Sequence, residues 1–157
     1  MELVELKQEA EHAGIYTELQ AMRFQGRITV SYEDLPEKVR NITVPKLILQ
    51  PVIENAFEHG LRNKVSDGSL TVKFIQIDNG VSITVEDNGD ELDNDKLNKL
   101  KNDLTNDDPN IELTGLLNIN KRIRMTYNNN SGVSVERAES GGLRVVILII
   151  TEECEES

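Results

Sequence analysis

The sequence has little cysteine, proline or aromatic character: its 157 residues include one cysteine, four prolines, six aromatic residues and no tryptophan. A single cysteine, Cys154, excludes an internal disulfide and is typical of proteins from a reducing compartment. A chain of this length corresponds to about one domain and buries roughly 68–70% of its unfolded surface. We therefore expect one domain that folds without disulfides or a structural metal.

Long hydrophobic runs and excess positive charge are also absent. The longest strongly apolar run, Leu143 to Ile150, contains Arg144 and is far shorter than the roughly 20 residues of a membrane-spanning helix. The charged first 11 residues do not resemble a signal peptide. The net charge of −11 argues against binding to nucleic acid or to an anionic membrane surface.

The negative charge is unevenly distributed. The segment from Glu86 to Glu112 holds ten acids and three bases, and residues 152–157 hold four glutamates, whereas the rest of the chain is neutral with 14 of each sign. Blocks of like charge are typical of mobile, solvated chain, which is the simplest interpretation of both segments.

The first half of the chain predicts two helices and one strand. Residues 2–24 carry apolar side chains at three- and four-residue steps, and residues 28–32 alternate as in a half-buried strand. A second helix is predicted from Lys46, with Pro51 near its first turn and Gly60 at its end. The side chains predicted to face the core from these helices are Leu3, Leu6, Ala10, Ala13, Tyr16, Leu19, Met22, Leu47, Ile48, Val52, Ile53 and Ala56.

The second half predicts most of the strands. Residues 70–74 and 81–85 alternate around a hairpin turn at Asp78-Asn79-Gly80, and two further strands follow a loop at residues 128–132, the last covering 142–150. Helices are predicted around Leu92 to Leu104 and from Leu116 to Met125. This irregular order favours an α+β two-layer sandwich over a repeated βαβ array.

The first group of candidate functional residues lies on the second helix. Asn55 and His59 are four residues apart and share one face, with Glu54 beside Asn55. Amide and carboxylate oxygens are ligands that suit a Mg²⁺ ion bridging substrate phosphates. The alternative is that Asn55 makes a local hydrogen bond and His59 interacts with the helix end.

The second group is Asp87-Asn88-Gly89 at the end of an alternating strand. The Asp87 carboxylate could accept a hydrogen bond from the exocyclic amine of adenine, and the same acceptor would face the carbonyl of guanine. Gly89 would allow the backbone to approach the base closely. The alternative is an ordinary turn, since Asp-Asn-Gly is a common turn sequence.

Two glycine-containing stretches complete the candidates. Thr114-Gly115-Leu116 opens a helix, whose free N–H groups could bind the phosphates of a nucleotide. Gly141-Gly142 could form a tight turn and nothing more.

Taken together and in this order, the four groups resemble the asparagine box, the two glycine boxes and the final glycine pair of the GHKL ATP-binding (Bergerat) fold. Histidine kinases, gyrase, HSP90 and MutL share this fold. Residues 44–60, VPKLILQPVIENAFEHG, resemble the asparagine box of LytS/YesM-type sensor histidine kinases. Residues 18–24, ELQAMRF, and 115–123, GLLNINKRI, are similar to two further stretches of that family.

The resemblance implies a mixed, mostly antiparallel sheet with helices on one face, and it assigns roles to the candidates. Asn55 would hold Mg²⁺ against the phosphates of ATP, with Glu54 assisting catalysis and His59 beside the nucleotide. Asp87 would bind the adenine amine and Gly89 would lie beside the base. Thr114, Gly115, Leu116 and Gly142 would complete the ATP site. Residues 1–26 would link to a phosphoacceptor region, residues 27–151 would form the catalytic domain with its lid at about 88–113, and residues 152–157 would be an acidic tail.

The resemblance also implies an activity. Hydrolytic GHKL members carry a glutamate four residues before the asparagine, whereas this chain has Pro51 there. We therefore expect a protein-histidine kinase that transfers the γ-phosphoryl group to a histidine outside this chain, since His12 lacks the phenylalanine partner of the family's acceptor. The alternatives are a degenerate module that acts through protein–protein contacts and, less favoured, an ATPase.

The implied partners are the phosphoacceptor and dimerisation domain of the same receptor and the receiver domain of a response regulator. The parent protein would be a membrane-anchored bacterial homodimer with this domain in the cytoplasm, and the isolated fragment could be a monomer.

Four residues depart from the family pattern: Glu58, Glu91, Leu113 and Leu143. Each adds bulk or negative charge near an anionic ligand, so we expect weak nucleotide binding, or binding that requires the lid to change shape. A calcium loop at Asp90 to Asp103 is a minor alternative, because the spacing and glycine of an EF-hand are absent.

Overall fold

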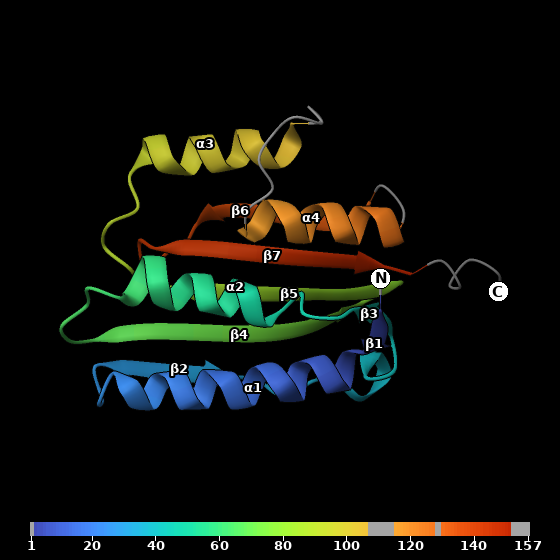
Figure 1. Ribbon diagram of the computed structural model, residues 1–157, viewed down its shortest axis with the longest axis horizontal. Helices are drawn as coiled ribbons and strands as arrows, with labels where there is room; N and C mark the ends of the chain where they lie inside the picture. The colour runs from blue at the N-terminus through green and yellow to red at the C-terminus, as the bar shows by residue number, and fades with distance from the viewer. Residues whose placement is uncertain (1, 107–114, 128–129, 152–157) are drawn as a thin grey trace.

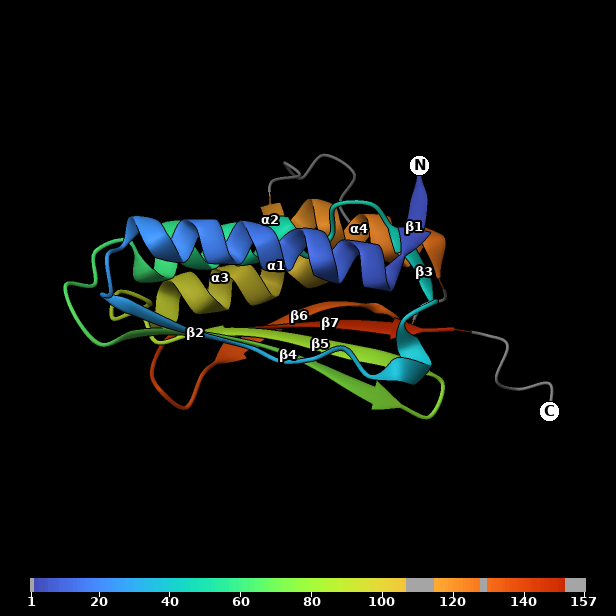
Figure 2. The same cartoon turned by 90° about the horizontal axis from the view of Figure 1, so that it is seen from below.

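The structure, a computed structural model, describes residues 2–106, 115–127 and 130–151. It confirms the α+β two-layer sandwich, with helices on one face of a five-stranded sheet (Figures 1 and 2). No helix among these residues is long and apolar enough to cross a membrane. Leu113, Thr114, Cys154 and the acidic tail lie outside the described residues.

The sheet has the strand order β2-β4-β5-β7-β6. The edge strand β2 (Ile28–Tyr32) runs parallel to β4 (Gly68–Ile77), and β5 (Gly80–Asp87), β7 (Leu143–Ile150) and β6 (Gly132–Arg137) continue the sheet with antiparallel pairing. The predicted hairpin turn joins β4 to β5. Strand β7, the most apolar segment, lies inside the sheet between β5 and β6.

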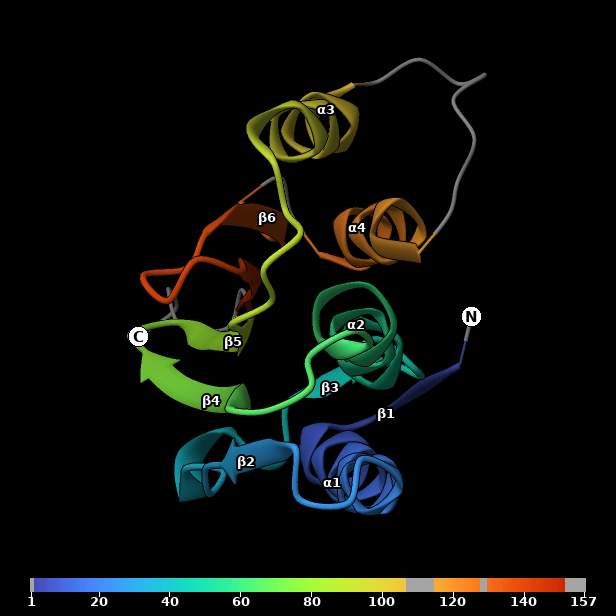
Figure 3. The ribbon, with the colours of Figure 1, turned by 90° about the vertical axis from the view of Figure 1, so that its left-hand side faces the viewer.

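The helical layer contains α1 (Leu6–Arg23), α2 (Gln50–Asn55), α3 (Asn94–Thr105) and α4 (Gly115–Thr126), seen end-on in Figure 3. Helix α2 continues directly into a π-helical turn, η2 (Ala56–Leu61). A 3₁₀ turn, η1 (Glu37–Val39), and a small sheet of β1 (Leu3–Glu5) with β3 (Thr43–Pro45) lie at one end. Inward side chains of the sheet and of these helices form one core.

Two predictions for the first helix are wrong. It begins at Leu6, because residues 3–5 pair with β3 as a strand. Leu19 and Met22 are not in the core but 58% and 69% exposed. Leu6, Ala10 and Ala13 are buried as predicted, and Glu9 and Thr17 complete the buried stripe of the helix.

The predicted bounds of the second helix are also wrong. It begins at Gln50, and residues 46–49 form a turn in which Leu47 has a φ of 62° and is 40% exposed. Pro51 lies in the first turn of the helix, as predicted. Gly60 does not end the helix, because it lies inside η2. The change from α- to π-helical bonding keeps the chain helical past this glycine.

Much of the acidic segment is structured. The expectation of solvated chain is wrong for α3, whereas the helix predicted around Leu92 to Leu104 is confirmed, with Leu97 and Leu104 buried in the core. The carboxylate of Asp93 caps this helix, accepting a hydrogen bond from the backbone N–H of Lys96 at 2.8 Å. Leu92 precedes the helix. Within the described ranges, no group of three or more His, Cys, Asp or Glu side chains could hold a metal ion, so a calcium loop finds no support.

Candidate functional site

A cleft with a volume of about 580 Å³ lies between η2, the end of β5 and helix α3. Its walls come from segments far apart in the sequence, which meet because β5 ends beneath the helical layer. The lining residues are Asn55, Glu58, His59, Gly60, Arg62, Asn63, Asp87, Gly89, Glu91, Leu92, Lys96, Leu100 and Leu143.

Asp87 is the buried charged group of this cleft, with only 4% of its surface exposed. As the last residue of β5 it follows the alternation of that strand, so its side chain points to the helical side with Val85 and Ile83. Its Oδ1 accepts hydrogen bonds from the backbone N–H groups of Gly89 at 2.8 Å and Leu143 at 3.5 Å. Burial raises the pKa of the carboxyl, and these two N–H groups partly oppose that effect.

Three glycines surround the Asp87 carboxylate. A Cβ atom at Gly60 would lie 2.5 Å from Cγ of Asp87, a Cβ at Gly89 would overlap the carbonyl of Gly60, and a Cβ at Gly142 would overlap Asp87 itself. Each of these positions therefore needs glycine so that backbone can pack directly against the acid. Sequence reasoning missed this role of Gly60, whose only signal was its place beside His59.

The asparagine-bearing wall is formed by α2 and η2. Asn55, His59 and Gly60 all line the cleft, as expected for residues one helical turn apart. Asn55 is half-buried, and within the described residues no group forms a hydrogen bond with its side-chain amide. Its oxygen is therefore available to a ligand or a metal ion.

The wall of the cleft opposite α2 and η2 consists of apolar side chains and the ammonium group of Lys96. Leu92, Lys96 and Leu100 are four residues apart and line the cleft from the lid segment and α3, while Leu143 lines it from the sheet. Apolar side chains on both sides suit a flat aromatic ring, and the nearby ammonium suits an anion.

Two polar pairs join the end of η2 to the chain that follows β5. The side-chain amide of Asn63 donates to both carboxylate oxygens of Glu91, at 3.0 and 3.3 Å. Lys64 forms an ion pair with Asp90 at 3.1 Å. Glu91, where the family pattern has glycine, therefore has a partner on the rim of the cleft, whereas Glu58 has none among the groups described.

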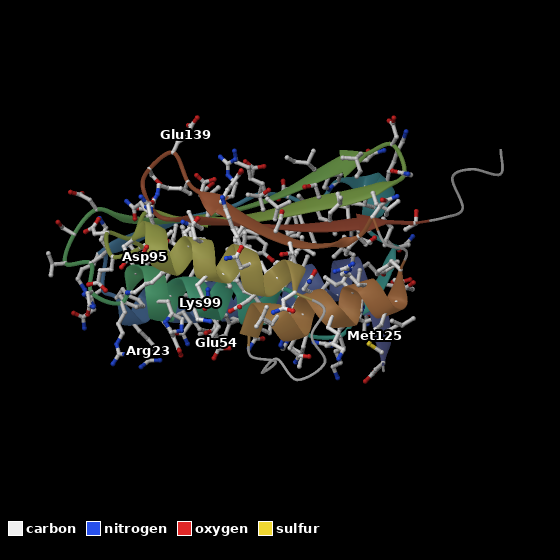
Figure 4. All side chains as sticks on the ribbon, turned by 90° about the horizontal axis from the view of Figure 1, so that it is seen from above. Arg23, Glu54, Asp95, Lys99, Met125 and Glu139 are labelled. Carbon is white, nitrogen blue, oxygen red and sulfur yellow. The ribbon has the colours of Figure 1, made fainter. Side chains whose placement is uncertain are left out.

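Several predicted site residues do not line the cleft. Glu54 is exposed on the outer surface of the helices and points away from the sheet (Figure 4). Gly115 opens α4 with a φ of 45°, and Leu116 is buried in the core. Gly142 lies behind Asp87.

The donor set fits a magnesium-bound adenine nucleotide. A buried carboxylate in a glycine cradle can bind an amine, and the apolar walls can enclose a ring. The described residues offer Asn55 as an oxygen ligand but no cluster of acids, which suits Mg²⁺ that takes most of its ligands from phosphates and water.

Comparison with known proteins gives a family match. Residues 40–153 match the family of histidine kinase-, DNA gyrase B- and HSP90-like ATPases. The chain is 32% identical to sensor protein LytS of Oceanobacillus iheyensis over 93% of its length, 31% identical to sensor histidine kinase YpdA of Escherichia coli over 89%, and 29% identical to sensor histidine kinase YesM of Bacillus subtilis over 94%. It covers 25%, 23% and 24% of these proteins, about a quarter of their length.

Solved structures share the fold. The ATP-binding domain of PrrB from Mycobacterium tuberculosis superposes with a TM-score of 0.59 at 17% identity, covering 97% of this chain and 98% of that one. The catalytic domain of histidine kinase ThkA gives 0.67 at 15% identity, covering 96% and 97%. LytS and YesM are sensor proteins to which the chain is similar. The chain belongs to the family of histidine kinase-, DNA gyrase B- and HSP90-like ATPases.

Proposed function

We propose that this chain is the ATP-binding catalytic domain of a two-component sensor histidine kinase. It transfers the γ-phosphoryl group of ATP to a histidine outside this chain, from which the group passes to an aspartate of a response regulator. The observation that carries the proposal is the buried Asp87 carboxylate in its glycine cradle, at one end of a cleft whose helical wall presents the amide of Asn55, which no other described residue binds.

Asp87 selects adenine in this proposal. An ionised carboxylate only accepts hydrogen bonds, so it pairs with the exocyclic amine of adenine and faces the carbonyl of guanine unfavourably. Gly89 lies beside the base, and Leu92, Leu100 and Leu143 supply the apolar walls.

The phosphates extend toward Asn55. Its amide oxygen would hold Mg²⁺, which supplies charge neutralisation when bound, with His59 beside the nucleotide. Arg62 and Lys96 offset part of the negative charge of Glu58 and Glu91 in the cleft. The start of α4, with Thr114, Gly115 and Leu116, would approach the phosphates together with the lid at about 88–113, and Gly142 supports Asp87.

Phosphoryl transfer fits this cleft better than hydrolysis. Activating water would need a general base, and Pro51 occupies the position four residues before Asn55, in the first turn of α2. Transfer to a histidine requires mainly positioning and charge neutralisation. The carboxylate of Glu54 is exposed on the helices and does not line the cleft, so a catalytic role for it stays a prediction.

The proposal extends to the whole protein. By similarity to the sensor kinases, the parent would be a membrane-anchored bacterial homodimer, with this domain in the cytoplasm beside the phosphoacceptor and dimerisation domain. The receiver domain of a response regulator would be the second partner, and no nucleic acid is involved.

The test is calorimetric titration of the chain with Mg²⁺ and a non-hydrolysable ATP analogue. We expect binding that Asp87→Asn weakens by about 10–100-fold, since a hydrogen bond to a charged group contributes about 1.5–3 kcal/mol. Asp78→Asn, in the exposed hairpin turn, is the matched control and should bind like the original chain. No binding at millimolar nucleotide, with Asp87→Asn no different, would refute the proposal.

A second candidate is a degenerate module that works by protein–protein contact. Glu58 favours it, because this carboxylate has no ion-pair partner among the described residues and lines the cleft, where it would repel an anionic ligand. Histidine phosphorylation in the full-length parent separates the two functions: transfer that Asn55→Ala abolishes excludes the degenerate module. An ATPase would instead release phosphate over many turnovers from the isolated domain.

A further inference from the structure

The turn before α2 is held in a strained conformation. Leu47 has a φ of 62°, a left-handed conformation that bulky side chains rarely adopt. Its side chain is half-exposed, so packing of that side chain does not hold it there. Such a residue persists only where its surroundings fix it, and strain of this kind often lies near functional sites.

Glu9 of α1 holds the N–H groups of this turn. Its Oε1 accepts a hydrogen bond from the backbone N–H of Leu47 at 3.1 Å, and its Oε2 accepts from Ile48 at 2.7 Å and Leu49 at 3.1 Å. With only 3% of its surface exposed, this carboxylate is directed entirely at the start of α2. It acts as a helix cap supplied by another helix, where the N-terminal residue Leu49 cannot cap itself.

Arg122 of α4 holds the carbonyl groups of the same turn. Its guanidinium donates to the carbonyl oxygen of Leu47 at 3.1 Å and also to that of Lys46. A negative group therefore fixes the N–H side of the turn and a positive group fixes the C=O side. The two come from different helices, so the turn ties α1, α2 and α4 together.

The position of Asn55 depends on this turn. Helix α2 begins directly after it and runs without interruption through Asn55 into η2. No described group bonds to the Asn55 amide, so the helix alone sets where the amide lies in the cleft. A shift of the first turn of α2 would therefore move Asn55 relative to the sheet, which carries Asp87.

We propose that Glu9 and Arg122 are positioning residues for the metal–nucleotide site, holding α2 so that Asn55 reaches the ion and phosphates while Asp87 binds the base. This inference rests on the proposed function for its ligand. Supporting groups behind a metal ligand typically change affinity by about 10–100-fold when they are removed. The same size of effect is expected here.

The first test needs no nucleotide. Glu9→Gln keeps the side-chain size but turns an amide NH₂ toward the backbone N–H groups, whereas Glu11→Gln changes an exposed residue of the same helix. In the ligand-free chain, the NMR signal of the Asn55 side-chain amide should move in Glu9→Gln and stay unchanged in Glu11→Gln. An unmoved Asn55 signal in folded Glu9→Gln overturns the proposal.

The second test compares two ligands. Glu9→Gln should weaken binding of the Mg²⁺-bound ATP analogue by about 10–100-fold and leave adenosine binding unchanged, because Asp87 is held by β5 and its neighbouring N–H groups. A merely structural role would lower the melting temperature and affect the binding of both ligands equally or of neither, and this result would contradict positioning.

If Glu9→Gln does not fold, Arg122→Lys replaces it in both tests. This variant keeps the positive charge but cannot donate to the carbonyl oxygens of Lys46 and Leu47 at the same time. If the original chain binds no nucleotide, the proposed function fails, and the Asn55 signal still decides positioning.

Discussion

At the scale of single residues, the burial of the Asp87 carboxylate makes the stability of the chain depend on pH. Because burial raises its pKa above the ordinary value of 3.8, the folded chain holds its proton more tightly than the unfolded chain does. Asp87 therefore contributes stability below pH 3.8, and this contribution is lost as the pH rises through the raised pKa. The free energy of unfolding is therefore lower with Asp87 ionised at neutral pH than with Asp87 protonated in acid.

The pH dependence of stability follows from this. Between about pH 4 and about pH 7, we expect the original chain to lose stability relative to Asp87→Asn, because Asp87 ionises over this range and asparagine does not titrate. Urea denaturation at a series of pH values measures this difference. Asp78→Asn should show no such trend, and a difference that shifts toward the original chain with rising pH would contradict burial as the main cause.

Gly60 gives a second prediction at this scale. Gly60→Ala should lower the free energy of unfolding by about 1–3 kcal/mol, because the added Cβ would lie 2.5 Å from Cγ of Asp87 and must displace it. Gly14→Ala is the control: its Cβ would meet the Tyr32 ring at an ordinary 3.4 Å, and alanine in a helix should stabilise by about 0.5–1 kcal/mol. Urea denaturation of both variants tests the pair, and equal effects would exclude a specific contact at Gly60.

At the scale of elements, one buried amide joins α3, α4 and β6. The Asn120 side chain of α4 donates to the carbonyl of Leu104 at 3.1 Å and accepts from the N–H of Val133 at 2.8 Å. Together with the buried leucines of α3, this contact explains why part of an acidic segment packs as a helix.

We expect Asn120→Ala to lower the free energy of unfolding by about 1–3 kcal/mol, because it leaves a buried N–H and a buried carbonyl without partners. Hydrogen exchange should accelerate at the Val133 amide and along α3. Asn118→Ala, on the exposed face of the same helix, should change neither. Unchanged protection of α3 in Asn120→Ala would mean that its leucines alone hold it.

At the scale of the whole molecule, net charge opposes an anionic ligand. The chain carries a net charge of −11. Of the charged residues that line the cleft, Glu58, Asp87 and Glu91 are acidic and Arg62 and Lys96 are basic. Charge repulsion over longer distances is screened by salt, with a Debye length of about 10 Å at 0.1 M.

This predicts an unusual salt dependence. The affinity for ATP without Mg²⁺ should rise between about 20 and 200 mM salt, because screening reduces the repulsion between the acidic chain and the tetra-anion. Binding of neutral adenosine should be unaffected and serves as the control. Calorimetry at several salt concentrations measures both ligands. Affinity that falls with salt would show that Arg62 and Lys96 dominate the local field.

Much of the fold followed from the sequence because its signals are local. The alternation of residues 70–74 and 81–85 around Asp78-Asn79-Gly80 defines a hairpin regardless of the rest of the chain. The order of the asparagine and glycine groups likewise indicated the family, which the match over residues 40–153 shows.

Other features required the tertiary structure. The periodicity of residues 2–24 placed Ala10 and Ala13 correctly in the core, but it did not show that the buried stripe ends at Thr17 and leaves Leu19 and Met22 exposed. A carboxylate in that stripe, Glu9, replaces the local cap that α2 lacks, so the start of α2 could not be found from its own residues.

The layers and the central strands could be predicted from the residues alone, because they depend on periodicity and on short motifs. The residues around Asp87, the start of α2 and the packing of the acidic segment became known only from the folded chain. Those outcomes depend on contacts between segments distant in the chain, such as Gly60 with Asp87 and Glu9 with Ile48, whose partners no local pattern specifies.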